Sequence, residues 1–271
     1  MKKLIPILFC SLLLGTSDCT IKTDDDDTQS LIWSDEFEGN FIDTTKWKFE
    51  TGDHGWGNNE LQNYQPQGSD NLEVNDGTLR ITARKIGPRQ RVGDYTSARI
   101  NSRKSFLYGR IEIRAKMPEY KGPGIWPALW MLGENIGDLG WPLCGEIDLM
   151  EYISSNPDSV LMTIHSQANN HMNGTQVSSG FVPLPNIEEE FNIFGLIWEE
   201  KRLIFYINGP EQVVLTINRP EEYNQENWPF DQPHFFLMNI AVGGNLGGLQ
   251  GVDDSIFPAT MEVDYVRVYS I

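Results

Sequence analysis

The chain has 271 residues, among them 25 Gly, 15 Pro and 8 Trp, and it carries a formal net charge of −17. This charge argues against a nucleic-acid partner and against a heavily sulfated polysaccharide, whereas a neutral ligand is indifferent to it. Few stretches are rich in Ala or Leu, and a chain of this length commonly forms one all-β domain. We therefore expect a single core.

The N-terminus has the pattern of an export signal over residues 1–18. Two lysines precede an apolar stretch, residues 4–14, that is too short for a membrane span. Cys19 follows where a bacterial lipoprotein carries its lipid-modified cysteine, although an aspartate replaces the usual small residue before it. Residues 19–29 are acidic, which predicts a flexible tether. We expect an exported protein with a domain over 30–271, either lipid-anchored through Cys19 at the cell (outer-membrane) surface, or secreted or periplasmic.

Apolar and polar residues alternate along several later segments, which is typical of strands with one wet face. The clearest cases are residues 79–84 and 110–116. Further candidate strands are residues 202–208, 212–218, 235–242 and 261–269. We predict an all-β fold, a β-sandwich jelly roll of two curved antiparallel sheets with a cleft on the concave face.

A Gly- and Pro-rich region, residues 122–142, contains Trp126, Trp130 and Trp141. Flat aromatic faces are good platforms for sugar rings. A single tryptophan in such a place is equally well explained by core packing. Three together favour a carbohydrate cleft.

Three carboxylates, Glu146, Asp148 and Glu151, follow within one strand's length. Side chains alternate along a strand, so Glu146 and Asp148 share a face and Glu151 points away from it. One extra residue in the strand restores Glu151 to that face, which predicts a β-bulge at Leu149 or Met150.

Two glutamates on one curved face suit a retaining glycosidase, in which one carboxylate attacks the sugar and the other acts as acid and base. The aspartate between them can hydrogen-bond the nucleophile. The alternative is a solvated acidic strand edge or a cation site. We interpret Cys144, the one cysteine of the expected domain, as a buried apolar residue rather than a second nucleophile.

With these motifs, the chain resembles glycoside hydrolase family 16, specifically bacterial laminarinase-like endo-β-1,3-glucanases. The extra residue in the carboxylate motif is specific to this branch. The resemblance covers nearly all of residues 30–271. Its motifs lie at residues 33–39, 55–62, 95–99, 106–110, 122–133, 146–151, 227–231, 239–244 and 263–269.

The resemblance implies that Glu146 is the nucleophile, Asp148 its assisting acid and Glu151 the general acid/base. A histidine in an apolar strand, such as His165, is otherwise more often a core residue. The resemblance implies sugar-binding roles for Asn59, Glu60, Arg99, Trp126, Trp130, Trp141 and His165.

The resemblance also implies a structural calcium ion at Glu38, Gly77 and Asp264, away from catalysis, with no cofactor for the reaction itself. Asp264 is explained as well by a role in strand pairing. We expect a monomer that hydrolyses β-1,3-glucan (laminarin), with mixed-linkage β-1,3/1,4-glucan as a further candidate substrate. The alternatives are action on agar, porphyran or carrageenan, transglycosylation, and glucan binding without catalysis.

Overall fold

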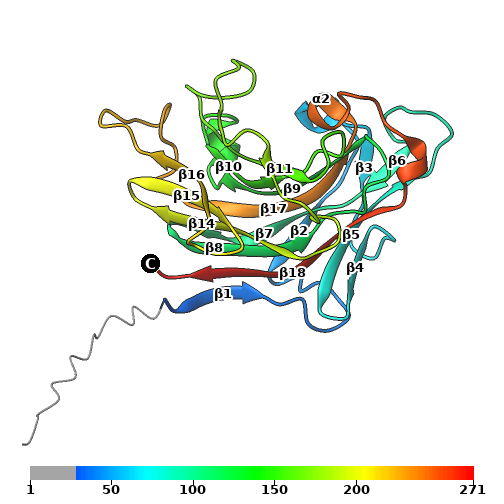
Figure 1. The fold of residues 1–271 in the computed structure, drawn as a ribbon, viewed down its shortest axis with the longest axis horizontal. Helices are drawn as coiled ribbons and strands as arrows, with labels where there is room; N and C mark the ends of the chain where they lie inside the picture. The colour runs from blue at the N-terminus through cyan, green and yellow to red at the C-terminus, as the bar shows by residue number, and fades with distance from the viewer. Residues whose placement is uncertain (1–28) are drawn as a thin grey trace, which may run out of the picture.

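The computed structural model describes residues 29–271 (Figure 1). The expected signal peptide, Cys19 and nearly all of the expected tether lie outside the described residues. In the part of the chain that is described, no helix has the length and apolar character needed to cross a membrane.

Within residues 29–271, eighteen strands form two sheets, as the alternating sequence predicts. The ten-stranded sheet has the order β16-β15-β14-β8-β18-β5-β6-β3, with β1 paired to β18 and β4 paired to β5. Its strands are β1 (Leu31–Asp35), β3 (Gln62–Tyr64), β4 (Leu72–Asn75), β5 (Thr78–Lys85), β6 (Tyr95–Ser97), β8 (Gly109–Lys116), β14 (Asn192–Glu199), β15 (Arg202–Ile207), β16 (Val213–Asn218) and β18 (Ala259–Tyr269).

The eight-stranded sheet has the order β12-β11-β10-β9-β17-β7-β2, with β13 paired to β11. Figure 1 shows its central strands curving, with loops rising at both ends. Its strands are β2 (Trp47–Glu50), β7 (Arg99–Phe106), β9 (Ile125–Gly133), β10 (Glu146–Glu151), β11 (Ser159–His165), β12 (Val177–Ser178), β13 (Val182–Pro183) and β17 (His234–Val242).

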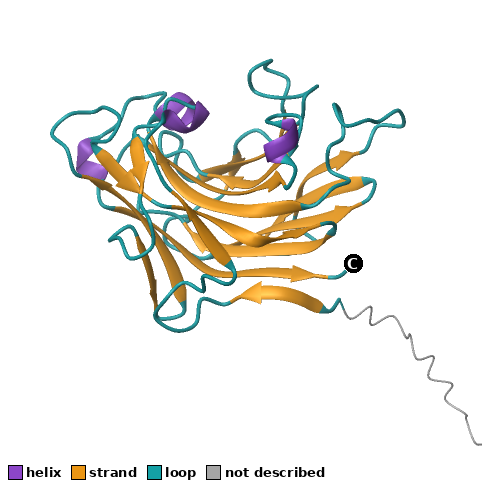
Figure 2. Ribbon diagram, turned by 180° about the vertical axis from the view of Figure 1, so that it is seen from behind, coloured by secondary structure: helices purple, strands orange, loops and turns teal. Residues whose placement is uncertain are grey.

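In the described part of the chain, helix is confined to short turns in the connections (Figure 2). These are α1 (Ile136–Leu139), α2 (Gly244–Gly247), and the 3-10 turns η1 (Gly55–Gly57) and η2 (Asp254–Ile256). The short helical content agrees with the all-β prediction, and all six segments singled out by alternation are strands to within two residues at each end.

The main core lies between the two sheets. Along β17, Phe236, Met238 and Ile240 point into this core, while Phe235 and Leu237 belong to a second, smaller apolar cluster with Leu132 and Cys144. Trp130 and Trp141 pack against that second cluster. The eight-stranded sheet therefore carries apolar side chains on both faces. The smaller cluster on its outer face packs against aromatic side chains there and limits their movement.

One pair of strands departs from the antiparallel prediction. Residues Gln62–Tyr64 of β3 run parallel to Tyr95–Ser97 of β6. Parallel neighbours need a crossover connection rather than a tight turn. Here β4 and β5 lie between the two strands in sequence and supply it.

Candidate active site

The predicted bulge is present in β10. Against β9, Asp148 pairs with Trp130 and Met150 with Leu129, so Leu149 is the extra residue. Against β11, three steps from Asp148 to Glu151 match two steps on the partner strand. Because of this one-residue excess, Glu151 returns to the face that Glu146 and Asp148 occupy.

The bulge also serves the core. Leu149 and Met150 are both completely buried in the core between the sheets. A regular strand would send one of two consecutive residues to the outer face. Here both apolar residues stay inside, and all three carboxylates lie on the outer face.

Each carboxylate has a defined neighbour on a flanking strand. The Trp126 indole Nε1 donates to Glu151 Oε1 over 3.1 Å, and Thr163 Oγ1 donates to Glu151 Oε2 over 3.2 Å. Nε2 of His165 lies 3.4 Å from Asp148 Oδ2 and 3.8 Å from Glu146 Oε1. His165 is therefore placed at the carboxylates, as the resemblance implied, and not in the main core.

Burial raises the pKa of all three carboxyl groups. The pKa of Glu146 is raised to about 8, first by burial and then by the charge of Asp148. Burial and the charge of Glu151 raise the pKa of Asp148 well above its ordinary value. Burial raises the pKa of Glu151, and His165 opposes that rise. Near neutral pH the cluster therefore retains protons, which a general acid requires.

Arg99 lies between two aromatic rings on the same face. Its guanidinium carbon is 4.8 Å from the centroid of Trp56 and 4.8 Å from that of Trp130. Glu50 forms an ion pair with it. Stacking and the ion pair together hold the planar guanidinium in one orientation.

A chain of hydrogen bonds links Glu60 to Trp130. The hydroxyl of Tyr64 donates to Glu60 Oε2 over 3.3 Å, and Asn239 Nδ2 donates to the same hydroxyl over 3.0 Å. Trp130 Nε1 in turn donates to Asn239 Oδ1 over 2.8 Å. The ring of Trp130, opposite Asp148 on the neighbouring strand, is thus held by buried groups from β3 and β17.

The remaining predicted residues lie at the edges of this arrangement. The Trp141 ring packs on His165 at 5.9 Å between centroids and on His171 at 4.9 Å. Asn59, in the left-handed region with φ of 58°, donates from Nδ2 to Asn245 Oδ1 over 2.8 Å. Trp126 and His165 therefore contact the carboxylates directly, and Trp141 packs on His165. Arg99 and Glu60 are connected to Trp130, the strand partner of Asp148, whereas Asn59 has no such connection in the described chain.

Sequence reasoning missed several polar and aromatic residues at this face. Most are single residues in ordinary strands, and only Trp56 and Asn239 stand inside motifs of the resemblance, at residues 55–62 and 239–244. Those with contacts to the predicted set are Glu50, Trp56, Tyr64, Thr163, His171 and Asn239.

Strand pairing places the three expected calcium positions near β18. Asp264 occupies a register shift between Val263 and Tyr265, and its carboxylate forms an ion pair with Arg114. The pairing of β1 with β18 ends at Asp35, three residues before Glu38, and Gly77 stands just before β5, which pairs with β18 from the other direction. The three positions therefore approach one stretch of β18, with Arg114 competing for one of the carboxylates.

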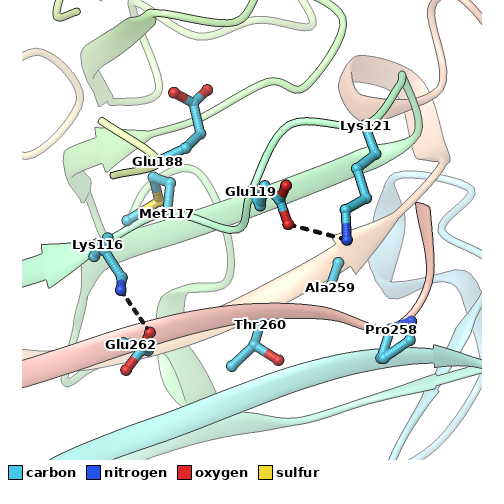
Figure 3. Close-up of a pocket in the computed structure, with 9 residues that line it drawn as sticks. All are labelled: Lys116, Met117, Glu119, Lys121, Glu188, Pro258, Ala259, Thr260 and Glu262. Carbon is cyan, nitrogen blue, oxygen red and sulfur yellow. Dashed lines mark ion pairs between the residues drawn. The ribbon is translucent and has the colours of Figure 1, made fainter. Parts of the chain in front are cut away.

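A separate cavity of about 250 Å³ lies on the outer face of the ten-stranded sheet (Figure 3). Both of its lysines are paired, Lys116 with Glu262 at 2.8 Å and Lys121 with Glu119 at 3.0 Å, and its third carboxylate, Glu188, accepts a hydrogen bond from Tyr152 over 2.6 Å. We assign it no role. Its walls are formed by Lys116, Met117, Glu119, Lys121, Glu188, Pro258, Ala259, Thr260 and Glu262.

Cys144 is buried and free, two residues before Glu146. Burial raises the pKa of its thiol to about 12, and the charge of Glu146 adds to the effect. A thiol with such a pKa is not a nucleophile near neutral pH. The interpretation of Cys144 as a small apolar residue is confirmed.

A β-sandwich with paired glutamates and aromatic rings on one sheet face is typical of enzymes that cleave polysaccharides. Comparison with known proteins agrees. The family model described as glycosyl hydrolases family 16 matches residues 59–267. The chain belongs to this family and is a glycoside hydrolase.

Individual relatives are similar over most of the chain. A beta-glucanase of Rhodothermus marinus is 41% identical, with 98% of this chain and 92% of the relative covered. The glucan endo-1,3-beta-glucosidase A1 of Niallia circulans is 39% identical over 89% of this chain and 38% of its own length. The X-ray structure of the laminarinase from Rhodothermus marinus superposes with a TM-score of 0.82 at 42% identity, covering 89% of this chain and 97% of that one.

Proposed function

We propose that the protein is a retaining endo-hydrolase of β-1,3-glucan. The bulged strand that brings Glu146, Asp148 and Glu151 to one face carries the proposal. The names of the similar proteins, a beta-glucanase, a glucan endo-1,3-beta-glucosidase and a laminarinase, support this choice of substrate. A neutral glucan also suits a chain with a net charge of −17.

In the first step, the Glu146 carboxylate attacks the anomeric carbon of the sugar, and the glycosidic carbon–oxygen bond breaks. Glu151 gives its proton to the leaving oxygen. The charge of Asp148 raises the pKa of Glu146, so a proton taken up by Asp148 removes that charge and favours the ionised form of the nucleophile.

In the second step, Glu151 is ionised and takes a proton from water. The resulting nucleophile attacks the same carbon and releases Glu146. The hydrogen bonds that Trp126 and Thr163 donate to Glu151 stabilise its ionised form at this stage. Two inversions leave the anomeric configuration unchanged. The reaction needs no cofactor.

We assign the sugar-binding surface to the aromatic and polar residues beside the carboxylates. Trp126, Trp130 and Trp141 offer ring faces to sugars, and Arg99 and His165 offer hydrogen-bond donors to hydroxyl groups. Their contacts to one another and to the carboxylates support this assignment. Asn59 and Glu60 extend the same surface beyond Trp130.

Export, oligomeric state and calcium binding are also part of the proposal. We propose that the protein is exported, through a signal at residues 1–18 and a lipid on Cys19 or by secretion, and that it acts as a monomer. We propose calcium at Glu38, Gly77 and Asp264 as a structural ion. Added Ca²⁺ should raise the melting temperature of the wild type and not of Asp264→Asn.

The test of the activity is a panel of laminarin, mixed-linkage glucan, agarose and carrageenan, with products identified by mass spectrometry. We expect laminarin to be shortened to oligosaccharides of several lengths, because an endo-enzyme cuts within chains. Proton NMR of early products should show a retained β configuration.

Glu146→Gln is the matched control for this panel. The amide keeps the size of the side chain and cannot attack, so turnover should fall by about 10⁴-fold or more while laminarin still binds. Laminarin left intact beside cleaved agarose or carrageenan would reject the substrate. Normal hydrolysis by Glu146→Gln would reject the nucleophile.

A further inference from the structure

Three potential metal ligands converge at the proposed active site. One carboxylate oxygen each of Glu146 and Asp148 and one imidazole nitrogen of His165 all lie within 4.8 Å of one another. They come from adjacent strands, since Glu146 and His165 are direct partners across β10 and β11. The sheet therefore holds the three groups in place before any ligand arrives.

The spacing of these atoms fits a tetrahedral ion. Zinc bonds to nitrogen and carboxylate oxygen measure about 2.0–2.2 Å, so two such ligands at a tetrahedral centre lie about 3.3–3.6 Å apart. The observed separations from His165 Nε2 are 3.4 Å to Asp148 Oδ2 and 3.8 Å to Glu146 Oε1. The Glu146 and Asp148 oxygens lie no more than 4.8 Å apart, so the partly exposed Glu146 side chain has to move inward to complete the set.

Two buried atoms at this point lack hydrogen-bond partners. Asp148 is 4% exposed, and its Oδ2 accepts no hydrogen bond from any residue between 29 and 271. His165 is 6% exposed, and its Nδ1 is likewise unpartnered within that part of the chain. Nothing in the described protein therefore prevents Nδ1 from carrying the ring proton, which leaves the Nε2 lone pair free for an ion.

We propose that Glu146, Asp148 and His165 form an inhibitory site for a divalent transition-metal ion, with Zn²⁺ as its best representative. Two carboxylates and one imidazole are a donor set for zinc and its neighbours in the first transition row. Calcium is a poor match, because it takes six to eight oxygen ligands and this site offers a nitrogen. The fourth position of the ion faces the outer side of the sheet and is left for water.

The inhibitory effect rests on the proposed role of Glu146, whereas metal binding does not. An ion on the Glu146 oxygen uses the lone pair with which that oxygen would attack the anomeric carbon. It also occupies the place of the sugar ring beside His165. Zinc and laminarin should therefore exclude one another, and inhibition should be competitive.

Binding is tested by calorimetric titration of the untagged chain with ZnCl₂. We expect one zinc ion per chain, at least about tenfold weaker binding by His165→Gln and by Asp148→Asn, and unchanged binding by His54→Gln. His54 is a matched control because it packs on Trp56, away from the three ligands. Circular dichroism verifies that each variant is folded. Wild-type affinity in folded His165→Gln would overturn the site.

Inhibition is tested by initial rates of laminarin hydrolysis at several zinc concentrations. The apparent KM should rise with zinc at constant kcat, EDTA should restore the rate, and the same concentration of Ca²⁺ should have no such effect. Zinc that binds in the titration but leaves KM unchanged would overturn the inhibitory role while keeping the metal site. Unchanged zinc binding in an enzyme that does not cleave laminarin would instead contradict the proposed substrate.

Discussion

The ion pairs of the ten-stranded sheet and the carboxylate cluster of the eight-stranded sheet differ in how acidic groups are partnered. On the ten-stranded sheet, acidic groups stand beside basic ones, as in the pairs of Arg267 with Glu36 and of Lys116 with Glu262. On the eight-stranded sheet, Glu146, Asp148 and Glu151 are gathered with only a histidine among them.

The pKa values follow this difference. Hydrogen bonds and charge from Arg267 lower the pKa of Glu36, whereas burial without a fixed cation raises the pKa of Glu146 to about 8. Gathering like charges costs stability, and this cost falls on the face where we propose that proton transfer takes place. The comparison thus separates charges that support the fold from charges that serve the reaction.

The largest expected effect comes from changing the register of β10. Insertion of one alanine between Met150 and Glu151 should turn Glu151 toward the core and leave Glu146 in place, because side chains alternate. Loss of the general acid should reduce laminarin hydrolysis by about 10²–10⁴-fold. A dinitrophenyl glycoside, whose leaving group needs no proton, should still give a burst of dinitrophenol if the strand is folded.

Deletion of Leu149 is the matched control for that insertion. Without the extra residue, β10 becomes regular, and the carboxylates of Glu146, Asp148 and Glu151 again share one face. We expect a loss of about 2–5 kcal/mol in stability from the missing leucine, with activity retained to within about tenfold. A folded deletion variant without activity would show that the bulge does more than set the register.

Replacing Asp148 by Asn tests whether the charge of Asp148 raises the pKa of Glu146. The charge of Asp148 raises the pKa of Glu146, so its removal should lower that pKa. Because the nucleophile must be ionised, the acidic limb of the pH profile of kcat/KM should move to lower pH. Asp76→Asn, in the exposed turn before β5, should leave the limb in place. A limb that stays fixed in Asp148→Asn would contradict this coupling.

A smaller effect is expected from the hydrogen bonds that hold Trp130. Tyr64→Phe removes the hydroxyl between Glu60 and Asn239 and leaves buried polar groups unpaired. A cost of about 1–1.5 kcal/mol should raise KM for laminarin roughly five- to tenfold with little change in kcat. Tyr95→Phe, which loses a hydroxyl contact to Asp254 instead, should not change KM. A fall in kcat alone would count against a positioning role.

The smallest effect is expected on the ten-stranded sheet. Glu36→Gln should cost less than about 1 kcal/mol, because Arg267 and Glu36 are each about one third exposed and solvent screens the pair. The folded pKa of Glu36 is lowered, so this stability is present above its unfolded value of 4.5 and is lost as pH falls below it. The difference in melting temperature between wild type and variant should therefore be larger at pH 7 than at pH 3, and hydrolysis should be unaffected.

Prediction from the sequence was accurate where the signal is local. Alternation located the strands, and the count of residues from Glu146 to Glu151 predicted the bulge that the pairing with β9 contains. It failed for Tyr64 and Asn239, which hydrogen-bond across 175 positions of sequence. Tyr64 lies outside every motif of the resemblance, and Asn239, although it opens the motif at residues 239–244, has no local pattern that shows which residues it contacts.

The sequence by itself determined which side chains share a face of a strand, because the backbone geometry of a strand repeats every two residues. The tertiary structure alone decided which strands are neighbours. It placed β17 between β9 and β7, and this order brings Asn239 to Trp130 and Arg99 to the same ring. Such contacts depend on the packing of the whole sheet, since their partners come from strands far apart in the chain.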